Sequence, residues 1–493
     1  MKLLRKANSG FHILRRRVVG MATKPGMFGV MASKSLLVLA ARRNLPRLAA
    51  WLLAWQVRPV CRATMGGRPI IALILPKSGF AEDVQSSLVR DGRYTVMALH
   101  RKAVKTIANC FFGELVDDNN YRQEDAAITA RKVSYRRFMI EVCRHLIPRL
   151  NLDVALTANF SFYAEQEFSA ALDHFGIPVV AMHKECLKTP GVEPFYEYTY
   201  SERKMPFQGR LISTYNEIER RIQINAGVAP ADRIVASGAP RLDRMHDWRR
   251  EHAGQDQSRD GRPTVLFMSF NEKAGCPIIG RRGDERFEAL DPEQERINWR
   301  NLVRNSHGAM VRLAVEHPEI QVIVKAKNHG LAMAALQDGF GKDFEAPDNL
   351  EIVIGGDPFE LIVSCDVICG FNSTSLFEAL SANVDVVVPN FDEAAEPLTM
   401  PYVVDLGGAA TRAGSVDELI AMLAAKALER PARNRAGELS QTNFQTLEKW
   451  IGNPDGQAGA RVSQLIMDLV QRRRQNAQAP DAAIAQEAQA IGS

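Results

Sequence analysis

From residue 364 the chain reads Ser364-Cys-Asp-Val-Ile-Cys-Gly-Phe-Asn-Ser-Thr-Ser-Leu-Phe-Glu-Ala-Leu-Ser-Ala-Asn-Val-Asp-Val-Val-Val-Pro389, and this stretch decides the fold class. The apolar run 367–369 predicts a buried strand, and the polar turn 372–375 opens a helical pattern. A second apolar run, 386–388, predicts the next strand. Because parallel strands need a crossover, this order predicts a βαβ unit.

The junction between that strand and that helix is a candidate phosphate site. Small polar residues at a helix start leave backbone N–H groups free, and the helix dipole adds partial positive charge. Asn372, Ser373, Thr374 and Ser375 therefore suit a phosphate or pyrophosphate. The alternative is an ordinary Ser/Thr cap with Glu378 in the first turn. The neighbouring motifs favour the phosphate site.

Strands and helices alternate in two series, which predicts an α/β chain with two Rossmann-like doubly wound domains facing a cleft. Ligands of such sheets bind beyond the carboxyl ends of the strands, which places residues 76–79, Asn159 and residues 183–185 at the cleft. The predicted organisation is an N-terminal extension 1–66, a first domain 67–250, a linker 251–262, a second domain 263–430, C-terminal helices 431–474 and a disordered tail 475–493.

The N-terminal extension is strongly basic. Fifteen Lys or Arg residues precede the first acidic residue, Glu82. The apolar segments 35–41 and 48–57, the second containing Trp51 and Trp55, are too short to span a bilayer. Basic residues beside Trp and Leu suit a helix on an anionic membrane surface, so we expect residues 1–64 to contact one. The alternatives, in decreasing order, are an arm packed on the protein itself and a nucleic-acid tether.

The seven cysteines are scattered and form no CxxC pair, so we expect neither a disulfide framework nor a zinc site. Cys365 and Cys369 flank a predicted strand and are expected to be buried apolar thiols. No Asp-x-Asp pair stands in a position suited to a metal. We therefore expect a cytoplasmic protein with no tightly bound cofactor and no metal.

Three motifs resemble those of GT-B transferases that build surface carbohydrates. Residues 233–243 (RIVASGAPRLD) are similar to an I-x-V-x-G-x-P-R-x-D motif at the end of the first domain. Residues 321–329 (QVIVKAKNH) are similar to a V-x-V-K-x-H-P motif at the end of a strand. The turn and helix at 372–380 resemble a nucleotide-diphosphate loop. Wall teichoic acid glycerophosphotransferases and capsule polysaccharide transferases share these sequence motifs, and UDP-N-acetylglucosamine 2-epimerases are distantly similar. The resemblance covers about residues 150–395.

The resemblance implies roles for the second domain. The turn Asn372 to Ser375 would hold the donor diphosphate, and Glu378 would accept hydrogen bonds from the ribose hydroxyls. Lys325 or Lys327 would neutralise the leaving nucleotide, with fixed donors favouring the charge of the transition state. This arrangement needs no metal. His329 lies two residues beyond the family's histidine position, which Lys327 occupies here.

For the first domain, the resemblance points to His183 as the base that activates the acceptor hydroxyl, with Glu185 as second choice. A lone His after a strand is otherwise more often a structural residue. Arg241 and Asp243 are expected to pair with each other and fix the domain exit rather than contact substrate. Here His183 is followed by Lys184, where the family carries Gly.

These departures leave three hypotheses open. The first is a transferase that moves a sugar or polyol phosphate from a nucleotide-activated donor to a lipid-linked or polymeric cell-surface glycan, peripheral on the cytoplasmic face of the membrane. The second is a soluble isomerase of the 2-epimerase type. The third is a non-catalytic partner in polysaccharide assembly.

Overall fold

The computed structural model describes residues 27–77, 79–113, 116–118, 121–122, 125–252, 261–277, 296–327, 329–341, 344–429 and 437–491, with side chains described from 34 to 476. The first 26 residues of the predicted N-terminal extension and most of the predicted linker lie outside these ranges. Among the described residues, no helix is long and apolar enough to cross a membrane.

The first sheet has seven strands in the order β1-β3-β2-β4-β5-β6-β7. All neighbours are parallel except β1 and β3, which pair antiparallel. Its apolar strands are buried on both faces, as parallel strands covered by helices are. The strands are β1 (Arg58–Cys61), β2 (Ile70–Leu75), β3 (Tyr94–Ala98), β4 (Val154–Thr157), β5 (Val179–Met182), β6 (Leu211–Thr214) and β7 (Ile234–Ala236).

The second sheet has six strands, all parallel, in the order β10-β9-β8-β11-β12-β13. The stretch 364–389 forms β11, a crossover helix and β12, side by side in this sheet, as predicted. The strands are β8 (Thr264–Met268), β9 (Gln321–Ala326), β10 (Leu350–Ile354), β11 (Val367–Gly370), β12 (Asp385–Pro389) and β13 (Thr411–Ala413).

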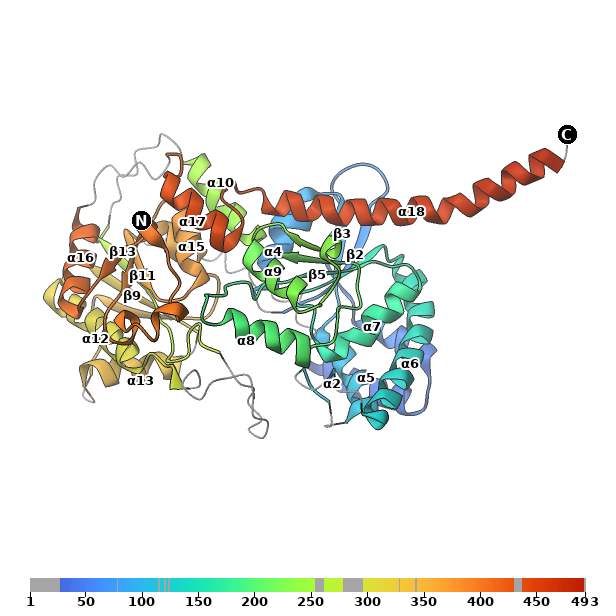
Figure 1. Ribbon diagram of the computed structural model, residues 1–493, viewed down its shortest axis with the longest axis horizontal. Coiled ribbons are helices and arrows are strands. Elements are labelled where there is room, and N and C mark those ends of the chain that lie inside the picture. Colours follow the sequence, from blue (N-terminus) through green and yellow to red (C-terminus); the bar gives the residue numbers. More distant parts are fainter. Residues whose placement is uncertain are drawn as a thin grey trace.

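Helices cover both sheets, which form two lobes lying side by side (Figure 1). In the first half of the chain they are α2 (Met27–Arg42), α3 (Pro46–Gln56), α4 (Phe80–Val84), α5 (Arg101–Phe112), α6 (Ala126–Leu150), α7 (Tyr163–His174), α8 (Glu193–Tyr198), α9 (Glu217–Asn225) and α10 (Asp243–Glu251). In the second half they are α12 (Arg300–Glu316), α13 (His329–Phe340), α14 (Phe359–Ser364), α15 (Thr374–Ser381), α16 (Val416–Leu428), α17 (Gln441–Ile451) and α18 (Ala458–Ile491).

The last helix, α18, returns from the second lobe and runs along the first (Figure 1). Val462, Ile466 and Val470 of α18 belong to the buried cluster that contains Ile70 and Val96 of the first sheet. The spacing of four residues places these three side chains on one helix face. The C-terminal segment therefore completes the core of the first lobe and ties the two lobes together.

The predicted fold class of two Rossmann-like doubly wound units in a GT-B-like arrangement is confirmed by these two sheets. Two expectations differ from the structure. The region 475–493, expected to be a disordered tail, continues helix α18 to Ile491. Its Ala and Gln residues favour helix, and extending an existing helix needs no new nucleation. Residues 58–61, placed in the N-terminal extension, form an edge strand of the first sheet.

Candidate functional site

The carboxyl ends of the first sheet bring three cations together around Gly79. Lys77 follows β2, Lys184 follows β5, and Arg241 lies in the 3₁₀ turn η4 (Pro240–Leu242) that follows β7. Gly79 has φ of +76°, and a Cβ there would lie 3.3 Å from Lys184 Nζ and 3.4 Å from Arg241 Nη1. The side chains of two distant loops therefore converge on this turn, at the edge where such sheets bind ligands.

Glu185 borders these cations. Its Oε1 lies 3.7 Å from Lys77 Nζ and 3.9 Å from Lys184 Nζ, and its side chain is 52% exposed. Burial raises the pKa of Glu185, but the charges of Lys184 and Lys77 outweigh this effect and lower it below its ordinary value. Glu185 is thus an ionised carboxylate at an accessible rim, able to accept a proton from a bound hydroxyl.

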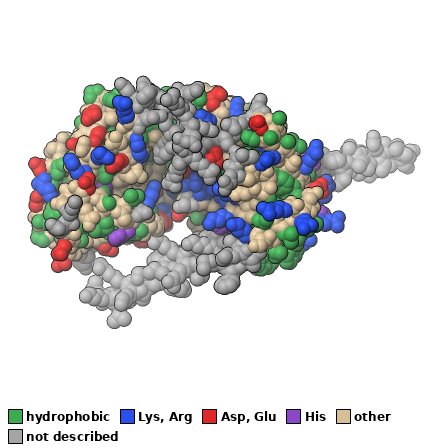
Figure 2. Space-filling model, turned by 90° about the horizontal axis from the view of Figure 1, so that it is seen from below, with side chains coloured by type: hydrophobic (Ala, Val, Ile, Leu, Met, Phe, Trp, Pro, Cys, Tyr) green, Lys and Arg blue, Asp and Glu red, His purple; other side chains and the backbone are tan. Residues whose placement is uncertain are grey.

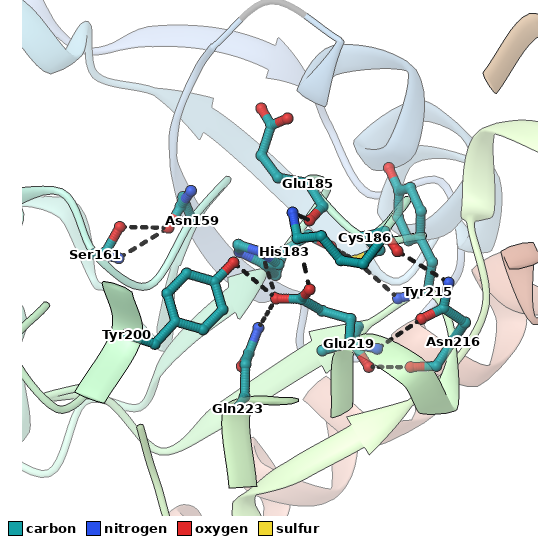
Figure 3. Close-up of polar contacts among 12 residues, drawn as sticks. Asn159, Ser161, His183, Glu185, Cys186, Tyr200, Tyr215, Asn216, Glu219 and Gln223 are labelled. Carbon is teal, nitrogen blue, oxygen red and sulfur yellow. Dashed lines mark hydrogen bonds and ion pairs between the residues drawn. The ribbon is translucent and has the colours of Figure 1, made fainter. Parts of the chain in front are cut away.

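His183, the first choice for the base, lies behind this rim with 1% exposure. Its Nε2 is 3.0 Å from Glu219 Oε1, an ion-pair distance (Figure 3). The ring packs against Phe160 at 5.4 Å between ring centroids. Neither ring nitrogen has an aligned hydrogen-bond partner among the residues the structure describes. Glu185 is therefore accessible from solvent, whereas His183 is not.

Glu219, which the sequence reasoning did not single out, is the buried carboxylate beside His183. Its carboxylate accepts hydrogen bonds from Tyr200 Oη at 3.0 Å and Gln223 Nε2 at 2.7 Å (Figure 3). Lys188 Nζ lies 4.0 Å from the same carboxylate. Burial raises the pKa of Glu219, but Lys188 and His183 together lower it below its ordinary value. Glu219 is the third residue after the helix cap Asn216, so the sequence here resembles a capping box at a helix start. Such a pattern gives no sign that the Glu219 side chain is buried.

The predicted donor loop lies at the edge of the second sheet. Ser373 caps α15, its side chain accepting a hydrogen bond from Ser375 N at 3.3 Å, and Thr374 is the first residue of that helix. Asn372 has φ of +45°. Its amide donates to the carbonyls of Ala274 and Tyr402 and accepts from the N–H of Val404. Asn372 therefore holds the turn in place by tying neighbouring loops, rather than offering its amide to a ligand.

The two lysines of the second strand exit differ in placement. Lys325, in β9, is buried and donates from Nζ to the carbonyl of Gly355. Lys327 and His329 are both exposed, and His329 begins α13. The structure thus keeps Lys325 within the lobe and leaves the other two at its surface.

Polar groups from both lobes meet between the sheets with unfilled hydrogen-bonding capacity. Glu378 Oε2, Arg241 Nε, Arg244 Nε and Glu82 Oε2 are buried and have no hydrogen-bond partner within the described ranges. Each such atom costs about 1–3 kcal/mol when buried unpaired. Because buried polar atoms are normally paired, a group of unpaired ones marks this place as a candidate binding site.

Glu378 is the centre of this group. Its Oε2 lies 3.7 Å from Arg244 Nη2, and Arg244 also forms a two-pronged ion pair with Asp357. Burial raises the pKa of Glu378, and the charges of Arg241 and Arg244 offset only part of this rise. The resemblance assigns Glu378 to donor binding. Its carboxylate is also close enough to Arg241 and Arg244, which follow the first sheet, to be influenced by their charges.

Arg241 and Asp243 do not form the predicted pair. Asp243 accepts hydrogen bonds from Asn453 Nδ2 and from the N–H groups of Ala458 and Gly459, at the start of α18. Asp243 opens α10, and its carboxylate meets the free N–H groups of the other helix there. Asp243 thus fixes the domain exit through a different partner, and the Arg241 guanidinium lies over the Tyr215 ring, 5.4 Å from its centroid.

A hollow separates the two lobes, and Lys and Arg side chains gather in it (Figure 2). In the part of the chain that is described, no group of three His, Cys, Asp or Glu side chains is arranged to hold a metal ion.

No protein-family model matches the chain, and no curated protein matches its sequence. Among solved structures, it is similar to a UDP-GlcNAc 2-epimerase from Neisseria meningitidis bound to UDP-GlcNAc, with 13% identity over 81% of this chain and 99% of that chain and a TM-score of 0.43. It is similar to the wall teichoic acid polymerase TagF, with 10% identity over 90% of this chain and 98% of that chain and a TM-score of 0.44. A trehalose 6-phosphate synthase from Burkholderia multivorans matches at 12% identity over 85% and 99% of the two chains, with a TM-score of 0.43. Structural similarity at these TM-scores says nothing about function.

Proposed function

We propose that this protein is a transferase that moves a sugar or polyol phosphate from a nucleotide-activated donor to a glycan acceptor in the hollow between the lobes. The observation that carries the proposal is the set of unpaired buried polar atoms on Glu378, Arg241, Arg244 and Glu82. They come from both lobes, and a ligand bound between the lobes would pair them.

The donor half of the site is the start of α15. Ser373, Thr374 and Ser375 offer hydroxyls, and Ser373 and Thr374 also offer N–H groups, to the donor phosphates at the positive end of the helix dipole. Glu378, one turn further, has a carboxylate oxygen with no hydrogen-bond partner in the described chain, and this oxygen would accept from a ribose hydroxyl. Fixed donors at this place favour the departing nucleotide, whose negative charge grows in the transition state.

The acceptor half is the rim of the first sheet, where Glu185 is the base. As the acceptor oxygen bonds to the transferred carbon or phosphorus, the bond to the nucleotide phosphate breaks, and the acceptor proton passes to the Glu185 carboxylate. Lys77 and Lys184 keep that carboxylate ionised before the transfer. His183 supports the rim from behind through its contact with Glu219.

Nucleotide binding to the full chain tests the donor site. UDP, CDP, GDP, ADP and CMP are each added to the protein and to a Ser373→Ala/Ser375→Ala variant, and melting temperatures are recorded. Binding to the folded state alone raises the melting temperature. We expect one base to give a shift that the variant loses, while Ser364→Ala, at the end of α14, keeps it. Absence of any nucleotide shift would sink the proposal and favour the non-catalytic alternative.

A membrane surface completes the proposal, with α2 and α3 as the contact on the cytoplasmic face. Within α3, Ala49, Ala50 and Leu53 pack into the first core, whereas Trp51 and Trp55 are 49% and 51% exposed. The helix therefore buries alanines and leucines and exposes its two tryptophans.

The neighbouring part of α2 has the same character. Leu36 and Leu39 are 45% and 47% exposed, and Arg42, Arg43 and Arg47 are exposed beside them. Trp and Leu suit the bilayer interface, and arginines suit its anionic lipids. Helices α2 and α3 would thus pack on the protein with one face and contact the membrane with the other.

A further inference from the structure

We propose that Ser269 is a specificity-determining residue, whose hydroxyl oxygen accepts a hydrogen bond from an O–H or N–H group of the transferred sugar or polyol. His307 is the positioning residue that holds the Ser269 hydroxyl in the required direction. The inference rests on the proposed function and adds to it a contact that selects the group to be transferred.

Ser269 lies at the point of the second sheet where ligands of such sheets bind. In the order β10-β9-β8-β11-β12-β13, successive strands run outward in opposite directions from the neighbours β8 and β11. Met268 and Gly370 are register partners at the ends of these two strands, and Ser269 directly follows Met268. The crevice beyond the carboxyl ends at such a switch point is the usual binding place in α/β sheets. Ser269 is partly exposed there.

The loop that begins at Ser269 packs against the proposed donor turn. The rings of Phe270 and Phe371 lie 5.3 Å apart, measured between their centroids. Further along the loop, the carbonyl of Ala274 accepts a hydrogen bond from the Asn372 amide at 3.1 Å. Ser269 therefore stands close to the turn that would hold the donor phosphates.

His307, on α12, decides which way the Ser269 hydroxyl points. Its ring is fully buried, and Nδ1 lies 2.7 Å from the carbonyl oxygen of Val303. A carbonyl only accepts, so Nδ1 carries the ring proton. Burial lowers the pKa of His307 to about 4, so the ring is neutral at neutral pH and Nε2 is an acceptor. Ser269 Oγ, 2.9 Å from Nε2, therefore donates its proton to His307.

This arrangement restricts what Ser269 can bind. Its proton is engaged by His307, so its oxygen can only accept further hydrogen bonds. An ionised phosphate also only accepts, so Ser269 is not matched to the donor diphosphate. The ribose hydroxyls are proposed to bind Glu378, one turn into α15. The transferred group is attached to the donor phosphate and carries hydroxyls or an amide N–H, which are the partners that this oxygen requires.

The same geometry disfavours a nucleophilic role for Ser269. A nucleophilic serine needs a base that takes up its proton during the reaction. Burial opposes protonation of His307, as its lowered pKa shows. The pair is therefore suited to orienting a hydroxyl and not to forming a covalent intermediate.

Binding of activated donors to the full chain, measured by titration calorimetry, tests the contact. UDP-glucose, UDP-N-acetylglucosamine, CDP-glycerol, GDP-mannose, ADP-glucose and CMP-N-acetylneuraminate are each compared with the nucleotide that they carry. We expect at least one donor to bind more tightly than its nucleotide. Ser269→Ala should bind that donor about two- to tenfold more weakly, the loss expected for one neutral hydrogen bond, and should keep its affinity for the nucleotide.

His307→Phe tests the positioning role, because it keeps an aromatic ring and removes both ring nitrogens. It should weaken the same donor by a similar factor and leave nucleotide affinity unchanged. Combined with Ser269→Ala it should cause no further loss, since His307 acts on the donor only through Ser269. Ser364→Ala, exposed at the end of α14, and His317→Phe, at the end of α12, are the matched controls and should bind the donor normally.

Four results would overturn the inference. They are that no donor binds more tightly than its nucleotide, that Ser269→Ala keeps full donor affinity, that Ser269→Ala weakens nucleotide and donor equally, or that the losses from the two single variants add. If His307→Phe does not fold, Ser269→Ala alone decides. All four results leave nucleotide binding to the original chain in place, whereas the proposed function itself fails only if no nucleotide binds.

Discussion

At the scale of single residues, the buried charges around Glu219 give a stability prediction with a pH signature. Glu219→Gln would leave Lys188 buried without its carboxylate partner. We expect the free energy of unfolding to fall by about 3–5 kcal/mol at neutral pH, the cost of breaking a buried ion pair. Because the pKa of Glu219 is lowered in the folded state, this stabilisation is complete above the unfolded pKa and is lost as pH falls through the folded pKa. Urea titrations of both proteins should therefore differ at neutral pH and converge in acid, while Glu217→Gln, exposed on the same helix, should change little. Equal stability of Glu219→Gln and the original chain at neutral pH contradicts the assignment. His183 could be singled out from the sequence because it follows a predicted strand. Its partner Glu219 lies 36 positions later on another element, and no local sequence pattern indicates that contact.

At the scale of elements, α3 shows what a sequence pattern leaves undecided. Its apolar run was predicted to contact a surface, yet apolar side chains lie on every side of the helix, so only packing against α6 decides which of them face outward. Strands with an apolar run were predictable, even the short β7, whereas β1 and β13 were missed because an Arg interrupts each of them and β1 also contains a Pro. We predict that Trp51→Ala/Trp55→Ala abolishes flotation with anionic phospholipid vesicles. Each half-exposed Trp has about 100 Å² to bury, so its loss removes about 2 kcal/mol of binding. Leu428→Ala, 45% exposed on α16, is the matched control and should float normally. Undiminished flotation of the tryptophan variant means that α3 is not the membrane contact.

At the scale of the whole molecule, Glu378 links donor binding to the relation between the lobes. It sits on α15 of the second lobe, yet Arg241 and Arg244, which follow the first sheet, supply the charges that oppose its burial. Because its pKa is raised in the folded state, an ionised Glu378 lowers stability, and this cost grows as pH rises through the folded pKa. Glu378→Gln should therefore melt at a higher temperature than the original chain at neutral pH, with the difference shrinking in acid. The same variant should bind the nucleotide about tenfold or more weakly, since a hydrogen bond to a charged group contributes about 1.5–3 kcal/mol. A residue that lowers stability but strengthens nucleotide binding is typical of a ligand-binding site. Glu360→Gln, exposed on α14, is the control and should alter neither property. If Glu378→Gln instead melts lower and binds nucleotide unchanged, the carboxylate is a structural tie between the lobes and the donor must bind elsewhere.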